Sequence, residues 1–144
     1  MKLLLPALLL TVVTVAMHCV GTYAAMTLGT VLQRKTVARR LLRVVRTQAY
    51  VVALMLIAHL CEAAIWAAAY RWLDALPDFS TAFYFSLTSY STVGYGDVVL
   101  PQAWRLLGPI ESVVGVLMLG WSTAVIVAML QNVFRENART GRSE

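Results

Sequence analysis

Long apolar runs alternate with short polar breaks along this chain. Apolar residues dominate at about 3–31, 49–72 and 104–134. An α-helix rises about 1.5 Å per residue, so each run is long enough to cross the roughly 30 Å hydrocarbon core of a membrane. The pattern therefore predicts three transmembrane helices.

A further apolar segment, residues 79–90, has only twelve residues. A helix of that length is too short to span a membrane. Asp78 precedes it directly and is a typical N-cap residue. A segment that does not span can lie at membrane depth only where protein or a water-filled cavity surrounds it. We therefore expect a re-entrant helix here, in an all-α membrane protein.

Composition agrees with a membrane location. Hydrophobic residues make up 60% of the 144 residues, and charged residues make up only 13%, whereas soluble domains average about 25% charged. The cysteines, Cys19 and Cys61, lie in apolar runs without metal-ligand spacing, so we expect buried free thiols.

The net charge of +5 is concentrated at two places that border apolar runs. The basic residues at these two places are Arg34, Lys35, Arg39, Arg40, Arg43 and Arg46 after the first run, and Arg135, Arg139 and Arg142 after the last. Basic residues beside membrane spans favour the cytoplasmic side. This distribution predicts an external N-terminus, a cytoplasmic C-terminus and no nucleic-acid partner.

The stretch Thr92-Val93-Gly94-Tyr95-Gly96 separates the re-entrant segment from the last apolar run. A dehydrated cation needs oxygens in place of its water shell, and backbone carbonyls supply them when successive carbonyls face one axis. An extended strand alternates its carbonyls, so residues with positive φ must interrupt it, and glycine adopts such angles at little steric cost. Because one loop forms only one wall, four copies are needed around an axis.

This stretch, followed by Asp97, resembles the signature sequence of potassium channels. The order outer helix, short helix, loop and inner helix resembles their pore module over residues 48–134. The resemblance implies a small prokaryotic-type channel with one extra N-terminal transmembrane helix. It further implies a homotetramer that conducts K⁺ passively across a plasma membrane of bacterial inner-membrane type. K⁺ is then the permeant ion, with no organic cofactor and no enzymatic activity.

The resemblance also assigns roles to individual residues. The carbonyls of the filter bind K⁺, and the filter comprises Thr92, Val93, Gly94, Tyr95 and Gly96. Asp97 is expected to bond an aromatic residue of the short helix, with Tyr84 as partner. The family often has paired tryptophans there, but Phe85 follows Tyr84 here and has no donor. We therefore expect the phenol of Tyr95 to rely on Ser89.

The last apolar run contains two glycines, Gly115 and Gly120. Each is either a hinge, as the resemblance implies, or a site of close helix packing, as small residues are in membranes. If Gly115 is the hinge, one face of this helix lines the central cavity. That face carries Val116, Leu119, Thr123, Val127 and Gln131.

Two acids, Glu62 and Glu111, lie inside apolar runs. Charged groups are costly there, so each should have a partner or stay protonated. For Glu111 two hypotheses stay open: a static hydrogen bond to hydroxyls of the short helix, or a protonation that adjusts the filter and makes conduction depend on external pH. The first run carries a polar stripe that predicts interhelical contacts: Thr11, Thr14, His18 and Thr22. His59 shows no ligand partner at a recognisable spacing, so we expect no catalytic or metal role for it.

The domain organisation follows from these elements. We expect an N-terminal transmembrane helix at 1–32, a basic interfacial helix or linker at 33–47, the pore module at 48–134 and a short cytoplasmic tail at 135–144. The pore module divides into an outer helix at 48–73, a pore helix at 79–90, the filter at 92–97 and an inner helix at 104–134.

Two interpretations of the basic stretch compete. Its arginines lie three apart in places, which resembles the charged helix of voltage sensors. The apolar residues take the opposite side of the helix, however, which is typical of an interfacial helix. We therefore expect contact with anionic lipid through Arg39, Arg40, Arg43 and Arg46.

Three alternatives compete with a homotetrameric potassium channel. Potassium transporters with four filter-like loops in one long chain fit poorly, because this chain has one loop. A less selective monovalent cation channel is a closer rival, although Tyr95 argues against it. A pore subunit of a hetero-oligomeric channel is the third.

Overall fold

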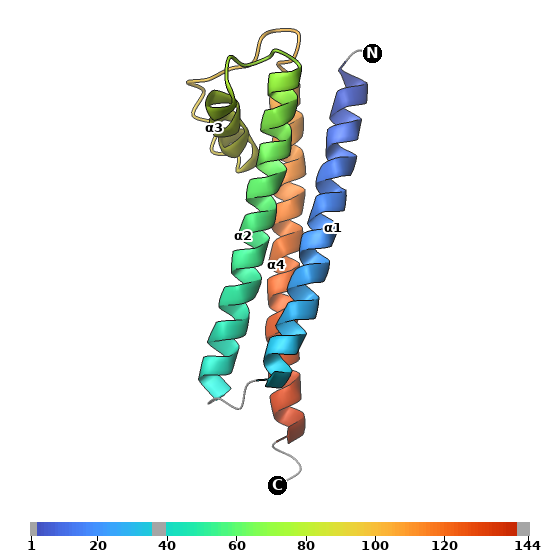
Figure 1. Ribbon diagram of the computed structural model, residues 1–144, viewed down its shortest axis with the longest axis vertical. Coiled ribbons are helices and arrows are strands. Elements are labelled where there is room, and N and C mark those ends of the chain that lie inside the picture. Colours follow the sequence, from blue (N-terminus) through green and yellow to red (C-terminus); the bar gives the residue numbers. More distant parts are fainter. Residues whose placement is uncertain (1–2, 36–39, 141–144) are drawn as a thin grey trace.

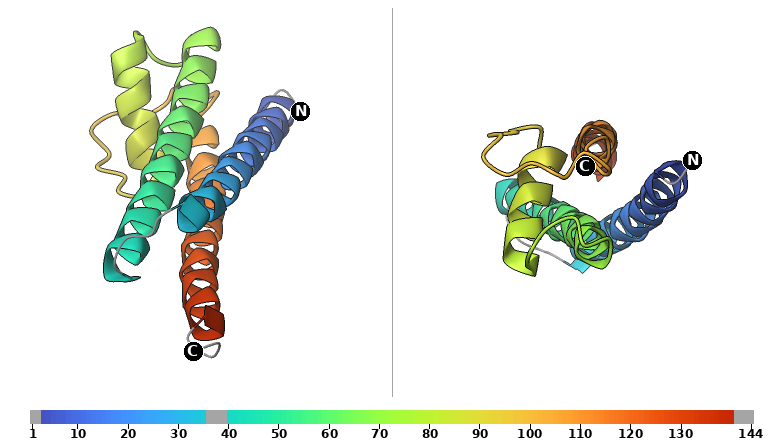
Figure 2. Two further views of the ribbon diagram at one scale, coloured as in Figure 1. Left: turned by 60° about the horizontal axis from the view of Figure 1, so that its bottom comes forward. Right: turned by 90° about the horizontal axis from the view of Figure 1, so that it is seen from above.

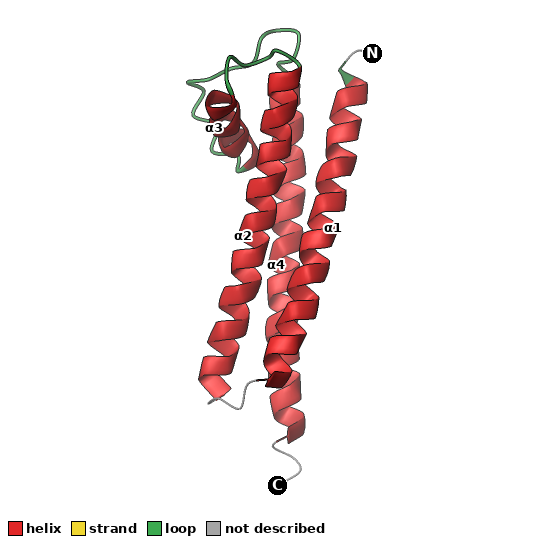
Figure 3. Cartoon of the chain, in the orientation of Figure 1, coloured by secondary structure: helices red, strands yellow, loops and turns green. Residues whose placement is uncertain are grey.

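Four α-helices make up the computed structural model, which describes residues 3–35 and 40–140. They are α1 (Leu4–Lys35), α2 (Arg40–Trp72), α3 (Phe79–Tyr90) and α4 (Leu107–Thr140), joined by loops (Figures 1 and 3). The described residues contain no strand. Helices α1, α2 and α4 are each long and apolar enough to cross a membrane. The predicted fold class, an all-α membrane protein with three such helices, is confirmed.

The short helix α3 packs against one side of the long helices. It contacts α2 and α4, whereas α1 contacts α2 and α4 from the other side (Figure 2). The start of α1 and all of α3 lie at one end of the molecule, and the start of α2 and the end of α4 lie at the other (Figure 1). The short helix therefore reaches only part of the way along the bundle.

The basic stretch differs from the expected separate interfacial helix. Helix α2 is continuous from Arg40 to Trp72, so residues 40–47 form its first turns. No glycine or proline interrupts this segment, so the helix has no sequence signal for a break near residue 48. Residue Arg39 lies outside the described residues. At the other terminus, α4 continues to Thr140, so much of the expected tail is helical.

The start of α3 confirms the predicted N-cap. Asp78 has extended backbone, and its carboxylate accepts hydrogen bonds from the backbone N–H of Thr81 at 2.9 Å and from the Thr81 hydroxyl at 2.7 Å. The bond from the Thr81 N–H is the main cause of a lowered pKa for the exposed Asp78 carboxyl. The cap therefore stays ionised and intact at neutral pH.

Apolar packing and several polar contacts hold the long helices together. Near α3, the buried side chains include Trp66, Tyr70 and Leu107. The indole N–H of Trp66 donates to the hydroxyl of Thr14 at 3.0 Å, which confirms an interhelical contact from the polar stripe of α1. Cys19 and Cys61 are free, but both are exposed at the bundle surface, so the expected burial is wrong for the single chain.

Candidate functional site

The loop that follows α3 folds back on the end of that helix. The N–H of Thr92 donates to the carbonyl of Ser89, and the N–H of Gly94 donates to the carbonyl of Thr88, each at 3.0 Å. Positive φ angles occur at alternate residues, with 63° at Thr92, 54° at Gly94 and 77° at Gly96. Glycine tolerates such angles, as predicted. The glycine pattern did not predict the positive φ at Thr92.

Residues 91–97 are all exposed in the single chain. Val93 is 52% exposed and Tyr95 is 72% exposed, although both are large and one is wholly apolar. The loop lies beside α3 and the start of α4, but neither helix covers it. The chain therefore presents loop 92–96 on an open face.

Asp97 follows this loop and is tied to α3. The hydroxyl of Tyr84 donates to the Asp97 carboxylate at 2.8 Å, so the predicted pair is present. This hydrogen bond is the main cause of a raised pKa for the Tyr84 phenol. Because the pKa is raised, the phenol keeps its proton, and the bond persists, throughout the neutral range.

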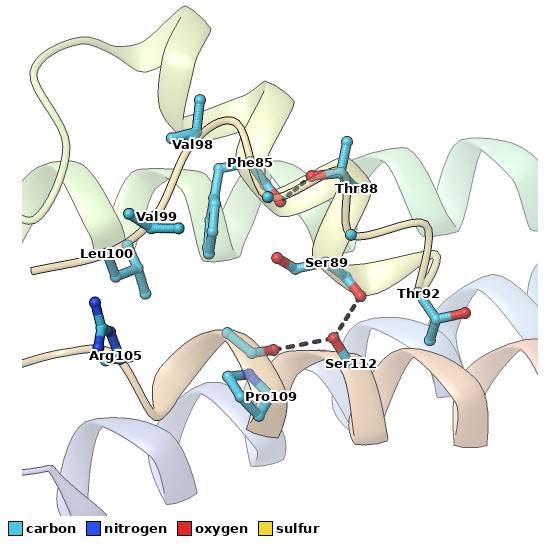
Figure 4. Close-up of a pocket in the computed structure, with 13 residues that line it drawn as sticks. Phe85, Thr88, Ser89, Thr92, Val98, Val99, Leu100, Arg105, Pro109 and Ser112 are labelled. Atoms are coloured by element: carbon cyan, nitrogen blue, oxygen red, sulfur yellow. Dashed lines mark hydrogen bonds between the residues drawn. The ribbon is translucent and has the colours of Figure 1, made fainter. Parts of the chain in front are cut away.

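Ser89 has a different partner from the expected one. Its backbone carbonyl accepts a hydrogen bond from the Ser112 hydroxyl of α4 at 2.6 Å (Figure 4). Among the described hydrogen bonds, none joins Ser89 to Tyr95. The expectation for this pair is wrong in the single chain, because Tyr95 points outward while Ser89 is buried between α3 and α4.

A groove of about 560 Å³ lies between α3, loop 92–96 and the start of α4 (Figure 4). Its lining is mainly apolar, with Phe85, Leu100 and Pro109 on one side and Thr92 and Ser112 nearer the loop. The groove is open to the surface of the single chain. Loop 92–96 therefore lacks support on this side from its own chain.

Helix α4 passes very close to the end of α3 at Gly115. A Cβ atom at this position would lie 2.0 Å from the backbone oxygen of Tyr90, far inside any normal contact. At Gly120 a Cβ atom would have nothing within 4 Å. The structure therefore gives Gly115 a packing role, while Gly120 has no such constraint.

The predicted cavity face of α4 lies on the surface. Leu119 is 40% exposed, Val127 is 46% exposed, and Thr123 is exposed with its hydroxyl bonded to the Leu119 carbonyl at 2.9 Å. Apolar side chains along one line of a helix are left without a covering partner from this chain.

Glu111 has the hydroxyl partner on α3 that one hypothesis predicted, and a second partner on α2 that it did not. The hydroxyl of Tyr70 donates to its carboxyl at 2.6 Å, and the hydroxyl of Ser86 on α3 lies 2.5 Å from its other oxygen. The Ser86 hydroxyl is also 2.7 Å from the Ala63 carbonyl. This fully buried acid therefore joins α2, α3 and α4.

Glu62 lies in a second polar network, which we call the buried histidine cluster: His18, His59, Glu62, Tyr90 and Ser122. Its carboxyl oxygens contact His18 Nδ1 at 2.9 Å and His59 Nδ1 at 3.1 Å, and one also accepts from Tyr90. The expectation that His59 has no partner is wrong. Glu62 follows it by three residues, a spacing that puts both on one helix face, and this was the missed signal.

Comparison with known proteins identifies the region that contains these features. Neither the curated proteins nor the solved structures yield a match to this chain. A protein-family model described as ion channel matches residues 51–132, which is more than half of the chain and includes α3, the loop and most of α2 and α4. The chain therefore belongs to the ion channel family.

Proposed function

We propose that four copies of this chain form a potassium-selective channel with loop 92–96 as its filter. The observation that carries the proposal is the alternation of positive φ at Thr92, Gly94 and Gly96. Such alternation turns successive carbonyls toward one side, where they replace the hydration shell of K⁺. The carbonyls of Thr92, Val93, Gly94 and Tyr95 are the proposed ligands.

Surfaces left open by the single chain support a tetramer. Loop 92–96 is exposed, the groove beside it is mainly apolar, and the Leu119 and Val127 side chains are uncovered. In the proposed assembly, four loops surround one axis, neighbouring chains cover the groove, and the α4 face lines the central cavity. Lipid covers exposed apolar side chains on the outside of a membrane bundle, but the polar backbone of loop 92–96 at membrane depth needs protein or water around it.

We further propose that the end carrying α3 faces outward in a plasma membrane. The first turns of α2 lie at the opposite end, with Arg43 and Arg46 among the basic residues there (Figure 1). Cytoplasmic flanks of membrane spans carry an excess of lysine and arginine. This orientation gives an external N-terminus and a cytoplasmic C-terminus.

Flux through liposomes tests the proposal. Purified protein should carry K⁺ much faster than Na⁺, and external Ba²⁺ should block the flux. Gly94→Ala should abolish selective flux because an alanine at a φ of 54° is strained. Leu9→Ala, at an exposed site on α1, is the control and should conduct like the wild type.

Other results separate the alternatives. Equal flux of Na⁺ and K⁺ would instead identify a less selective cation channel. A monomer in both mild detergent and membranes would contradict the tetramer, as cross-linking and mass measurement would reveal. Flux only in the presence of a second type of chain would identify a subunit of a hetero-oligomeric channel.

A further inference from the structure

The buried histidine cluster lies where all four helices meet, apart from the proposed conduction path. His18 on α1 and Glu62 on α2 are fully buried, Tyr90 at the end of α3 is 3% exposed, and Ser122 on α4 is 5% exposed. The His59 side chain is 13% exposed, so the cluster reaches the surface at one point. Buried polar groups in a membrane helix bundle are costly unless they have a function or full pairing.

Three members of the cluster carry groups that bind transition metals. His18, His59 and Glu62 each offer one ligand atom, and these atoms all lie within 4.8 Å of one another. Both imidazoles direct Nδ1 at the carboxylate, at 2.9 Å for His18 and 3.1 Å for His59. Zinc binds histidine nitrogen and carboxylate oxygen at about 2.0–2.2 Å in tetrahedral geometry, so two ligand atoms of one ion lie about 3.3–3.6 Å apart. The carboxylate and the two imidazoles need to separate by only a few tenths of an ångström to admit the ion.

The other nitrogen of each ring faces Ser122. The Ser122 Oγ atom is 2.9 Å from His59 Nε2 and 3.4 Å from His18 Nε2. A hydroxyl has one proton to donate but two lone pairs that accept. Two neutral imidazoles with protons on Nδ1 would compete for that single proton. With an ion on both Nδ1 atoms, each Nε2–H donates to Ser122, so every ring nitrogen has a partner.

This arrangement matches the way metal sites are generally supported. A histidine ligand usually donates its second N–H to a fixed acceptor, which sets the orientation of the ring. Ser122 supplies that acceptor for two rings at once. The Tyr90 hydroxyl, 3.2 Å from His59 Nδ1, adds a further oxygen beside the ligands.

We propose that His18, His59 and Glu62 bind one divalent transition-metal ion of the zinc type. Imidazole suits zinc and its neighbours in the first transition row, and the Glu62 carboxylate supplies negative charge in apolar surroundings. The ion links α1 to α2. Tyr90 contacts Glu62 and lies two residues before Thr92, so the ion is also one side chain away from loop 92–96.

Zinc binding to the purified full-length chain tests this proposal without measuring conduction. Cys19 and Cys61 are first replaced by serine, because exposed thiols bind zinc themselves. Titration calorimetry with Zn²⁺ should give one ion per chain. His18→Ala and His59→Ala should each lower the affinity at least tenfold, and Ser122→Ala should lower it by about 10–100-fold, as loss of an outer partner does.

A second variant keeps the test decisive if the alanine variants fail to fold. On the same cysteine-free background, His59→Cys replaces one ligand type with another. Bound Co²⁺ should then show thiolate-to-metal charge transfer, which the parent chain cannot show. A cysteine-free chain that takes up no zinc overturns the proposal. The proposal is also overturned if folded His18→Ala and His59→Ala chains bind zinc as tightly as the parent chain. The cluster is then a network of hydrogen bonds without a metal.

Discussion

At the scale of single residues, two acids hold opposite sides of α3. Asp97 bonds Tyr84, and Glu111 contacts Ser86. Successive residues of an α-helix are about 100° apart, so these two partners face nearly opposite directions. One contact anchors the outer end of the loop, and the other anchors α3 to the bundle. Each can therefore be removed separately.

Replacing Tyr84 by phenylalanine should weaken the support of the loop without changing the permeant ion. The substitution removes the bond to Asp97 but leaves the backbone of residues 92–96 untouched. Sustained current, or the thermal stability of the assembly, should fall while K⁺ remains favoured over Na⁺. Tyr23→Phe, at a side chain 73% exposed on α1, is the matched control. Identical behaviour of the two variants would refute a supporting role.

The hydrogen bond between Tyr84 and Asp97 should be lost in alkali and should stay intact around neutral pH. The Tyr84 pKa is raised above its ordinary value, so the bond contributes below that ordinary pKa and is lost as the pH rises through the raised one. The wild type should be more stable than Tyr84→Phe at neutral pH, and this difference in stability should disappear only in strong alkali. A difference that already disappears at neutral pH would contradict this.

Glu111 should tolerate an isosteric change much better than an apolar one. Glutamine keeps a carbonyl for Tyr70 and offers an amide to Ser86, whereas leucine leaves the buried Tyr70 hydroxyl without an acceptor. Each orphaned buried group costs about 1–3 kcal/mol. In a thermal scan, the Glu111→Leu variant should therefore unfold at a clearly lower temperature than the Glu111→Gln variant.

The pH hypothesis for Glu111 has its own measurement. If its protonation adjusts the filter, the current of the wild type depends on external pH, and Glu111→Gln keeps the current but loses that dependence. A wild-type current that is flat across the near-neutral range would leave Glu111 with its structural role alone.

At the scale of elements, the crossing of α3 and α4 sets the position of the loop. Gly115 lets α4 approach the backbone of Tyr90, and the Ser112 hydroxyl bonds the Ser89 carbonyl one turn earlier. Both contacts involve the last residues of α3. Because backbone atoms cannot rotate away as a flexible side chain does, this crossing has little freedom to adjust.

Gly115→Ala should therefore disturb the crossing, and Gly120→Ala should not. At residue 115 the new methyl group meets the Tyr90 carbonyl oxygen at 2.0 Å, and overpacking of this kind costs about 1–3 kcal/mol. At residue 120 the methyl group meets nothing within 4 Å, and alanine favours the helix by about 1 kcal/mol. Thermal unfolding of the two variants should shift in opposite directions. Equal shifts would mean that Gly115 is not a packing site.

At the scale of the whole molecule, the basic start of α2 and the loop lie at opposite ends. The first turns of α2 contain Arg43 and Arg46, whereas α3, which bonds Asp97 through Tyr84, lies at the far end of the bundle (Figure 1). These arginines belong to the first turns of α2, and the same helix continues as a membrane-spanning helix. They are thus held near one membrane surface by the helix itself, without a separate surface segment.

Neutralising this end should weaken the response to anionic lipid. Attraction to an anionic surface is worth about 1 kcal/mol per basic residue close to it. Replacing Arg39, Arg40 and Arg43 together by glutamine should reduce any stimulation of flux by anionic lipid in liposomes. Arg71→Gln, in the last turn of α2 and outside the groove, is the control and should keep the lipid response. An unchanged response in the triple variant would leave the stretch as a simple connection.

The elements themselves could be predicted from the sequence, because their signals are local. Run length indicated three spans, and Asp78 before residues 79–90 marked the start of the short helix. The alternating glycines at 94 and 96 indicated positive φ in the loop. Each of these features depends on neighbours a few residues away, which the order of residues contains directly.

Contacts between distant residues were decided by the tertiary structure. The absence of glycine and proline after Arg40 allowed one long helix, but hydropathy alone placed its start near residue 48. His18 meets Glu62 across 44 positions of sequence, and Gly115 meets Tyr90 only because α3 ends against α4. Such pairings depend on how helices cross, and crossings follow from side-chain shapes on both surfaces at once. The sequence by itself therefore determined the helices and the loop, while helix packing decided which acids and histidines meet.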